Sequence, residues 1–320
     1  MLSKKDQTLA IVDPATLHVV GRVPVGDDPH EVIASSDGHT AYVSNYGFGA
    51  FHTLAVVDLL AQHEEPQIDL GALRGPHGLA FEQGKVWFTA EAAKAIGSYD
   101  PGSGKVNWIM GTGQNRTHML YVFPDAQRIM TTNVNSATVT LLEHTDGPAG
   151  GPPPPPPGAQ GGRRTIPGPP GGDWKETVIP VGGGAEGFDV SPDGKQAWVA
   201  NAWDGTISVI DVAEKKVTAT VQANARGANR LKFTPDGQRV LISAGPELVV
   251  FDVAAQKEVK RLRIGHGGGG GILVQPDGQR AYVAFSEDGF VAVVDLKTLE
   301  VVGKVDAGPN PDGLAWAVRK

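Results

Sequence analysis

The sequence predicts an all-β fold, a seven-bladed β-propeller of four-stranded blades, and three observations support this prediction. A short strand-like segment that ends in an acidic residue recurs seven times along the 320 residues. Each repeat has room for four short strands rich in β-branched and aromatic residues. No segment of useful length has helical periodicity. Because four strands per unit of this length are typical of propellers, we expect a single domain that spans residues 1–320.

The recurring segment defines the period. It ends, in chain order, at Asp13, Asp58, Asp100, Glu143, Asp211, Asp252 and Asp295. Successive ends are 41 to 45 residues apart, except for one interval of 68 residues between Glu143 and Asp211. Since an acid recurs here in every unit, at a turn that favours Asp, we interpret these acids as structural.

The long interval contains a low-complexity segment. From about residue 145 to 172 the chain is dominated by proline and glycine, with six consecutive prolines from Pro152 to Pro157. The segment has too few apolar residues to pack, and removing it restores the usual period. We therefore predict a disordered Pro/Gly-rich insertion between the third and fourth strands of its unit, on the face opposite the predicted site.

The order of strands within a unit predicts how the ring closes. A first strand of small residues leads into a tight turn, which is Pro-Asp-Gly in three units, and the glycine supplies the positive φ that such a hairpin needs. The chain starts inside a second strand, at residues 1–4, and ends in a lone first strand from Gly313 to Val318. We therefore expect one C-terminal strand to join three N-terminal strands in the seventh blade.

Two second-strand sequences, AYVSN and AWVAN, and the Pro-Asp-Gly turns resemble the YVTN (YncE-like) β-propeller repeat family. The resemblance covers essentially the whole chain apart from the insertion. It implies the propeller fold and, because relatives are mostly envelope or secreted proteins, a periplasmic or secreted location. It implies no single chemistry, since that family contains binding, scaffold and enzymatic members. Residues 1–3 look like the middle of a strand, so we expect that an export signal peptide has been removed.

The composition excludes several classes of partner and site. The net charge is −7 without any basic block, which argues against nucleic acid. The absence of cysteine removes disulfides, thiol nucleophiles and thiolate metal sites. No apolar run approaches the length of a membrane span. We expect a monomer that binds a small molecule or carbohydrate.

One position at the start of each first strand faces the mouth of the central channel, where chemistry in propellers is usually found. In chain order this ring position holds His30, His77, His118, Glu186, Asn229, Gly270 and Asp312. Three histidines from successive blades, followed by a carboxylate, therefore surround one axis.

This pattern predicts a metal site formed by His30, His77 and His118 with help from Glu186. Neutral imidazoles on a rigid scaffold present fixed lone pairs, and three of them leave open positions for water or substrate. Such ligands suit a divalent transition metal: Zn, Fe or Cu, or Mn if the carboxylate joins. The alternative is a wet, polar mouth in which the imidazoles bind only water or backbone.

Loops on the same face supply candidate catalytic residues. Tyr46 or Glu91 could act as a general base beside a metal. Arg116 and Arg230 suit a carboxylate or another oxyanion on a substrate, because guanidinium offers a planar fork of donors. The alternative for both arginines is pairing with carboxylates at the mouth.

Together these features predict a metal-dependent enzyme that acts on an oxyanionic small molecule or sugar derivative. Lyase, lactonase and oxygenase chemistry all remain open. The rival hypothesis is a non-catalytic binding or scaffold propeller of the cell envelope.

Overall fold

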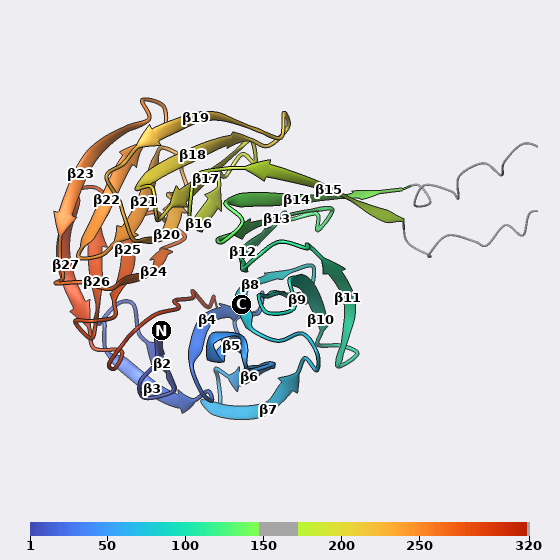
Figure 1. Cartoon of the computed structure of the whole chain (residues 1–320). Helices are drawn as coiled ribbons and strands as arrows, with labels where there is room; N and C mark the ends of the chain where they lie inside the picture. Colours follow the sequence, from blue (N-terminus) through green and yellow to red (C-terminus); the bar gives the residue numbers. More distant parts are fainter. Residues whose placement is uncertain (147–171, 319–320) are drawn as a thin grey trace, which may run out of the picture.

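The computed structural model describes residues 1–146 and 172–318, and its strands form seven antiparallel sheets arranged as blades around a central axis (Figure 1). Six sheets have four strands each, and the chain enters each of these at the strand nearest the axis. The first three of these blades are β4 (Pro29–Ala34), β5 (Thr40–Asn45), β6 (Thr53–Asp58) and β7 (His63–Asp69); β8 (Pro76–Glu82), β9 (Lys85–Ala90), β10 (Ala95–Asp100) and β11 (Lys105–Gly111); and β12 (Thr117–Val122), β13 (Arg128–Asn133), β14 (Thr138–Thr145) and β15 (Asp173–Pro180). The next three are β16 (Ala185–Val190), β17 (Gln196–Asn201), β18 (Thr206–Asp211) and β19 (Lys216–Gln222); β20 (Ala228–Phe233), β21 (Arg239–Ala244), β22 (Glu247–Asp252) and β23 (Lys257–Arg263); and β24 (Gly269–Val274), β25 (Arg280–Phe285), β26 (Phe290–Asp295) and β27 (Glu300–Val305). The predicted seven-bladed propeller is confirmed.

The predicted insertion leaves the blade where expected. Strands β14 and β15, the third and fourth strands of their blade, pair directly, and Thr145 faces Asp173 at the end of the ladder. Residues 147–171, which carry the six prolines, lie outside the described part of the chain. The prediction that this segment is disordered concerns these residues and stays a prediction.

Turn chemistry explains why the repeats break into short strands. The glycines of the three Pro-Asp-Gly turns, Gly194, Gly237 and Gly278, have φ values of 71°, 69° and 71°. Six of the seven strand-end acids accept hydrogen bonds from the turn that follows them: Asp58, for example, accepts from the backbone N–H of Leu60 at 2.7 Å. Glu143 differs, because it lies within β14 and pairs with Lys215. These six acids therefore have the structural role at a turn that was predicted for them.

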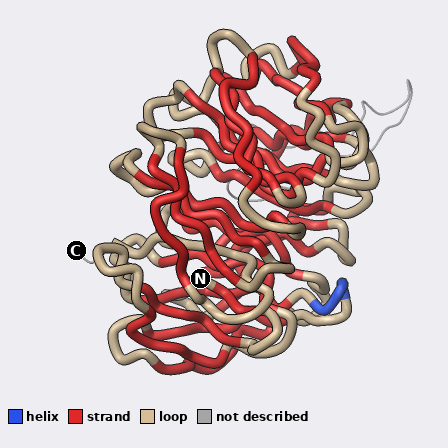
Figure 2. The backbone as a smooth tube through the Cα atoms, turned by 90° about the vertical axis from the view of Figure 1, so that its left-hand side faces the viewer, coloured by secondary structure: helices blue, strands red, loops and turns tan. Residues whose placement is uncertain are grey.

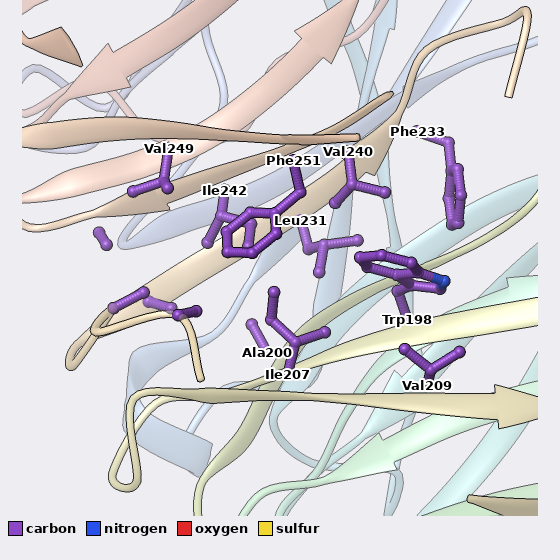
Figure 3. Packing of buried hydrophobic residues seen from close by; sticks show 14 residues of the cluster. Trp198, Ala200, Ile207, Val209, Leu231, Phe233, Val240, Ile242, Val249 and Phe251 are labelled. Carbon is purple, nitrogen blue, oxygen red and sulfur yellow. The ribbon is translucent and has the colours of Figure 1, made fainter. Parts of the chain in front are cut away.

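The hydrophobic core lies between neighbouring blades. One cluster joins Trp198 and Ile207 of β17 and β18 to Phe233 and Phe251 of β20 and β22 (Figure 3). Trp198 is fully buried in this cluster. Because every blade packs on the next in this way, the ring is one continuous structure and the channel mouth is held from all sides.

The closing blade differs from the other six. It contains β1 (Leu2–Ser3), β2 (Thr8–Val12) and β3 (Val19–Pro24). The C-terminal segment reaches its innermost position, where Pro311 forms a bridge with Ser3 and Gly313 accepts a hydrogen bond from the Leu2 N–H at 3.0 Å. Closure by both chain ends is thus confirmed, although residues 313–318 do not form a regular strand.

Helix is almost absent from the described residues (Figure 2). The one helical segment that the structure describes is the 3-10 turn η1 (Gly47–Gly49), which lies between β5 and β6. Within residues 1–146 and 172–318, therefore, no helix has the length and apolar character needed to cross a bilayer.

Candidate functional site

Every inner strand of the six complete blades is irregular at the ring position. The pairing register with the second strand shifts between Pro76 and Leu79 on β8, and the other five inner strands shift at the equivalent place. Such bulges redirect a side chain that would otherwise follow the pleat. The ring residues of these six blades therefore owe their position to a repeated irregularity.

Hydroxyl groups on the second strands stabilise these bulges. Thr89 accepts a hydrogen bond from the Gly78 N–H at 2.9 Å and donates one to the His118 carbonyl of the next blade at 2.6 Å. Ser243 does the same between the Arg230 N–H and the Gly270 carbonyl, at 3.1 and 2.7 Å. Each hydroxyl thus links two neighbouring ring positions.

Glycine after a ring residue allows neighbouring inner strands to approach closely. A Cβ atom on Gly78 would lie 2.7 Å from the His118 carbonyl oxygen, and one on Gly187 would lie 2.5 Å from the Cα of Arg230. Neither contact is sterically possible without movement of the backbone. The close approach brings polar side chains from successive blades into direct contact.

The three predicted histidines lie side by side in one row. The ring centroids of His30 and His77 are 5.0 Å apart, and those of His77 and His118 are 3.9 Å apart. Only 2% of the surface of His77 and 1% of that of His118 is exposed. The structure therefore brings together the histidines that sequence spacing selected.

His118 lies between two carboxylates. Its Nδ1 contacts the Glu91 carboxylate, and its Nε2 lies 3.0 Å from Oε1 of Glu186. Burial by itself lowers the His118 pKa, but these carboxylates outweigh burial and raise the pKa above its ordinary value. Burial alone raises the Glu186 pKa, but His118 and then Arg116 lower it to about 2. Both carboxylates therefore favour the protonated form of His118.

His77 is the opposite case. Burial is the main cause that holds its pKa well below the ordinary value, and the positive charges around it act in the same direction. Its Nδ1 is buried and has no hydrogen-bond partner among the described residues. A neutral imidazole with a free buried nitrogen is chemically suited to bind a metal ion.

The donor atoms of His77, Glu91 and His118 all lie within 4.8 Å of one another. Of the four predicted metal ligands, this group contains two, and it adds Glu91, which the sequence suggested as a general base. Glu186 contacts the group through His118.

His30 belongs to the same row, but its nitrogens face other partners. Lys4 Nζ lies 2.7 Å from His30 Nε2, and Asp28 Oδ1 lies 3.2 Å from the same nitrogen. Asp312 Oδ2 is 3.6 Å from His30 Nδ1. This second cluster joins the two ends of the chain to the first complete blade.

The other predicted catalytic residues surround the histidines. The Tyr46 hydroxyl donates to Glu91 at 2.5 Å, and burial followed by that hydrogen bond raises the Tyr46 pKa, so the phenol stays protonated. Arg116, with 36% of its side chain exposed, lies 3.5 Å from Glu91 and 3.4 Å from Glu186. It is the cation that faces both carboxylates and solvent.

Arg230 crosses the channel to a partner that sequence reasoning missed. Its guanidinium pairs with Glu31, which follows His30 on β4, and its Nε–Oε1 distance is 3.0 Å. Its Nη1 also donates to the Asn229 side chain at 2.9 Å. Because Arg230 is buried, it stabilises the channel rather than facing solvent.

Comparison with known proteins identifies the fold. No protein-family model matches this chain, and no curated protein matches it. A hydrazine synthase chain from Kuenenia stuttgartiensis is similar in structure, with a TM-score of 0.72 and 14% identity over 91% of this chain and 90% of that one. The chain is a seven-bladed β-propeller. A functionally unknown protein from Desulfotomaculum acetoxidans has a TM-score of 0.75 and 13% identity over 98% of this chain and 96% of its own. At such identities the likeness shows the fold alone.

The close approach of β8 and β12 is tested by Gly78→Ala. The added Cβ meets backbone rather than a flexible side chain, so we expect a loss of about 1–3 kcal/mol in the free energy of unfolding. Gly111→Ala is the matched control, because no heavy atom lies within 4 Å of its Cβ position. Urea unfolding measures both variants, and equal stability of the two would contradict the steric role of Gly78.

The charged network predicts a specific acid sensitivity. Because the folded pKa of Glu186, about 2, is below its ordinary value of 4.5, its stabilising contribution is complete above about pH 4.5 and is lost as the pH falls toward 2. The contribution is on the order of 3 kcal/mol. Glu186→Gln is expected to be less stable than wild type at pH 6 and to lose less stability between pH 4.5 and 2.5. The free energy of unfolding of both proteins is measured across this pH range. If it fell in parallel for wild type and Glu186→Gln, this assignment would be contradicted.

Proposed function

We propose that this propeller is a metal-dependent enzyme whose ion is held by His77, Glu91 and His118 at the channel mouth. The observation that carries the proposal is the buried, unpartnered Nδ1 of His77 beside two further ligand atoms, all within 4.8 Å. A buried polar atom without a partner is costly unless a ligand satisfies it. Two histidines and a carboxylate form a common donor set for transition metals.

The remaining predicted ligands take supporting roles in this proposal. Glu186 lies against His118 Nε2 and would orient that imidazole, as outer carboxylates commonly do at metal sites. The nitrogens of His30 are near Lys4, Asp28 and Asp312. In this proposal His30 therefore does not bind the ion but supports the position of the His77 ring. The donor set suits Zn, Fe, Cu or Mn.

The surrounding side chains define the chemistry proposed for the site. A bound divalent ion supplies Lewis acidity toward a substrate oxygen. Arg116, partly exposed between two carboxylates, would orient the oxyanionic group of a small molecule or sugar derivative. The protonated Tyr46 hydroxyl is placed to donate a hydrogen bond, and Glu186, whose low pKa keeps it ionised, would act as an anionic hydrogen-bond acceptor. Lyase, lactonase and oxygenase reactions are all compatible with these roles.

Metal binding competes with the proton on His118. Glu91 and Glu186 stabilise the imidazolium, which has no free lone pair. As the pH rises through the raised pKa of His118, the proton leaves and the nitrogen becomes available to a metal. Affinity for the ion is therefore proposed to increase with pH.

The metal proposal is tested by metal analysis of protein without a polyhistidine tag, after reconstitution at pH 8. We expect about one equivalent of a transition metal in wild type and its loss in His77→Ala. His63→Ala is the matched control, because His63 belongs to an exposed group with Asp58 and Glu65 that could hold an ion on the outer surface. Metal that survives in His77→Ala but disappears in His63→Ala would contradict the proposal.

A non-catalytic binding or scaffold propeller is the second candidate, and one observation favours it. Glu91 and Glu186 flank His118 as ion pairs, while Arg230 and Glu31 bridge the channel. Such a network can simply fix the geometry of the ring. Wild-type protein that binds no metal after reconstitution would favour this function. Membership of the YVTN family, a periplasmic or secreted location and a monomeric state are also proposed, on the sequence features given above.

A further inference from the structure

The loop between β5 and β6, on the face of the histidines, is longer than its counterparts. It contains seven residues, 46–52, and part of it is the 3-10 turn η1, which Figure 2 shows in blue at the edge of the molecule. The equivalent loops of the other five complete blades contain four residues or fewer. Each of those five loops, all among the described residues, has one residue with positive φ: Lys94, Ala137, Gly205, Gly245 or Gly289.

The longer loop has three such residues in succession. Gly47, Phe48 and Gly49 have φ values of 53°, 49° and 87°. Glycine adopts this left-handed region readily, but a bulky residue such as phenylalanine rarely does. The first complete blade therefore departs from the repeat at the channel mouth, and the departure is centred on Phe48.

Phe48 combines this backbone strain with exposure. Its side chain is 87% exposed, more than that of any other large hydrophobic residue that the structure describes. Burial of the ring therefore does not compensate for the strained backbone. A costly conformation that presents an aromatic ring to solvent indicates a functional constraint.

Local contacts hold the loop in this conformation. The Ala50 N–H donates to the Gly47 carbonyl at 2.9 Å, and the Phe51 carbonyl accepts from the Gly75 N–H of the next blade at 2.7 Å. A Cβ atom on Gly47 would clash with the Phe51 ring, so this ring packs directly on the Gly47 backbone. The loop is thus anchored on both sides, and Phe48 presents a preorganised surface to a ligand.

Tyr46 connects Phe48 to the histidines and to the cation of the mouth. The ring centroids of Phe48 and Tyr46 are 5.8 Å apart, and those of Tyr46 and His77 are 5.1 Å apart. The Tyr46 hydroxyl donates to Glu91, whose Oε1 lies 3.5 Å from Arg116 Nε. An apolar ring and a guanidinium are therefore the two exposed groups that lie next to this tyrosine.

Arg116 has donor capacity left for a ligand. Its Nε faces Glu91 and its Nη2 faces Glu186, but its Nη1 has no ion-pair or hydrogen-bond partner among the described residues. With 36% of the side chain exposed, this nitrogen is available to a carboxylate from solvent.

The surroundings of Phe48 favour an aromatic group over a sugar. Residues 47–51, Gly-Phe-Gly-Ala-Phe, contain no polar side-chain atom. The neighbouring loop contributes Ala92, whose Cβ lies 3.3 Å from the Cβ position of Gly49. Sugar hydroxyls would find no side-chain hydrogen-bond partner on this loop, whereas an aromatic ring gains contact area by stacking on Phe48.

We propose that the channel mouth binds aromatic carboxylic acids in which a short chain joins the ring to the carboxylate, with the ring on Phe48 and the carboxylate on Arg116. This inference rests on the proposed function for the role of Arg116, and it specifies the substrate class. Phe48 is then the residue that determines specificity for the ring.

The probes are 3-phenylpropionate, propionate, 3-phenylpropanamide and galacturonate, and calorimetric titration of the whole protein measures their affinities with and without zinc. We expect 3-phenylpropionate to bind about tenfold more tightly than propionate, because its ring adds apolar contact. We expect the uncharged amide to bind about tenfold more weakly than the acid. Phe48→Ala should abolish the preference for the ring and leave affinity for propionate unchanged, and Phe48→Trp should retain the preference.

Trp203→Ala is the matched control. Trp203 lies on the equivalent loop between β17 and β18 and is 55% exposed, so that non-specific stacking of the probe would involve it as well. We expect this variant to bind all four probes as wild type does. Because the Phe48 side chain is exposed, the thermal unfolding midpoint of Phe48→Ala is expected to stay close to that of wild type.

Four results would overturn this proposal: no saturable binding of 3-phenylpropionate up to millimolar concentration, equal affinity for the acid and its amide, a ring preference that survives in Phe48→Ala or is lost in Trp203→Ala, and tighter binding of galacturonate than of 3-phenylpropionate. Zinc content is measured on the same samples. Bound zinc without a ring preference counts against this inference alone, and a ring preference without bound zinc counts against the metal site alone.

Discussion

The close approach of neighbouring inner strands at the channel mouth is the constraint on which the site depends. Bulges at the ring position turn one side chain per blade toward its neighbours, and glycines such as Gly78 and Gly187 leave room for the next backbone. Hydroxyl bridges from Thr89 and Ser243 hold successive blades at that separation. Polar groups that would be solvated on an isolated strand are thereby buried against one another, where each must find a partner.

The buried groups resolve this requirement in two different ways. Around His118 and Arg230, opposite charges pair, and each pair keeps its members ionised. His77 instead remains neutral and keeps one nitrogen without a partner. The neighbouring imidazoles therefore differ, because the surroundings of His118 favour its charged form and those of His77 its neutral form. At the proposed metal site, an incoming ion would have to compete with a proton on His118.

Sequence periodicity predicted the blades, the ring closure and the row of histidines, because these depend on local patterns repeated at a fixed interval. It did not predict the bulges, because these arise from the pairing register between two strands. The sequence feature that accompanies them is the recurrent Ser or Thr at positions such as Thr89 and Ser243. Pairing of Arg230 with Glu31 connects residues 199 positions apart, and no local pattern contains that contact.

The most direct test of the proposed metal site is to ask where an added ion binds. Crystals grown at pH 8 with zinc, measured on both sides of the zinc absorption edge, would give an anomalous difference map. We predict one strong peak within bonding distance of His77, Glu91 and His118, with Glu186 against the far side of the His118 ring. A peak confined to the outer surface at Asp58, His63 and Glu65, or a mouth without a peak in zinc-saturated crystals, would contradict it.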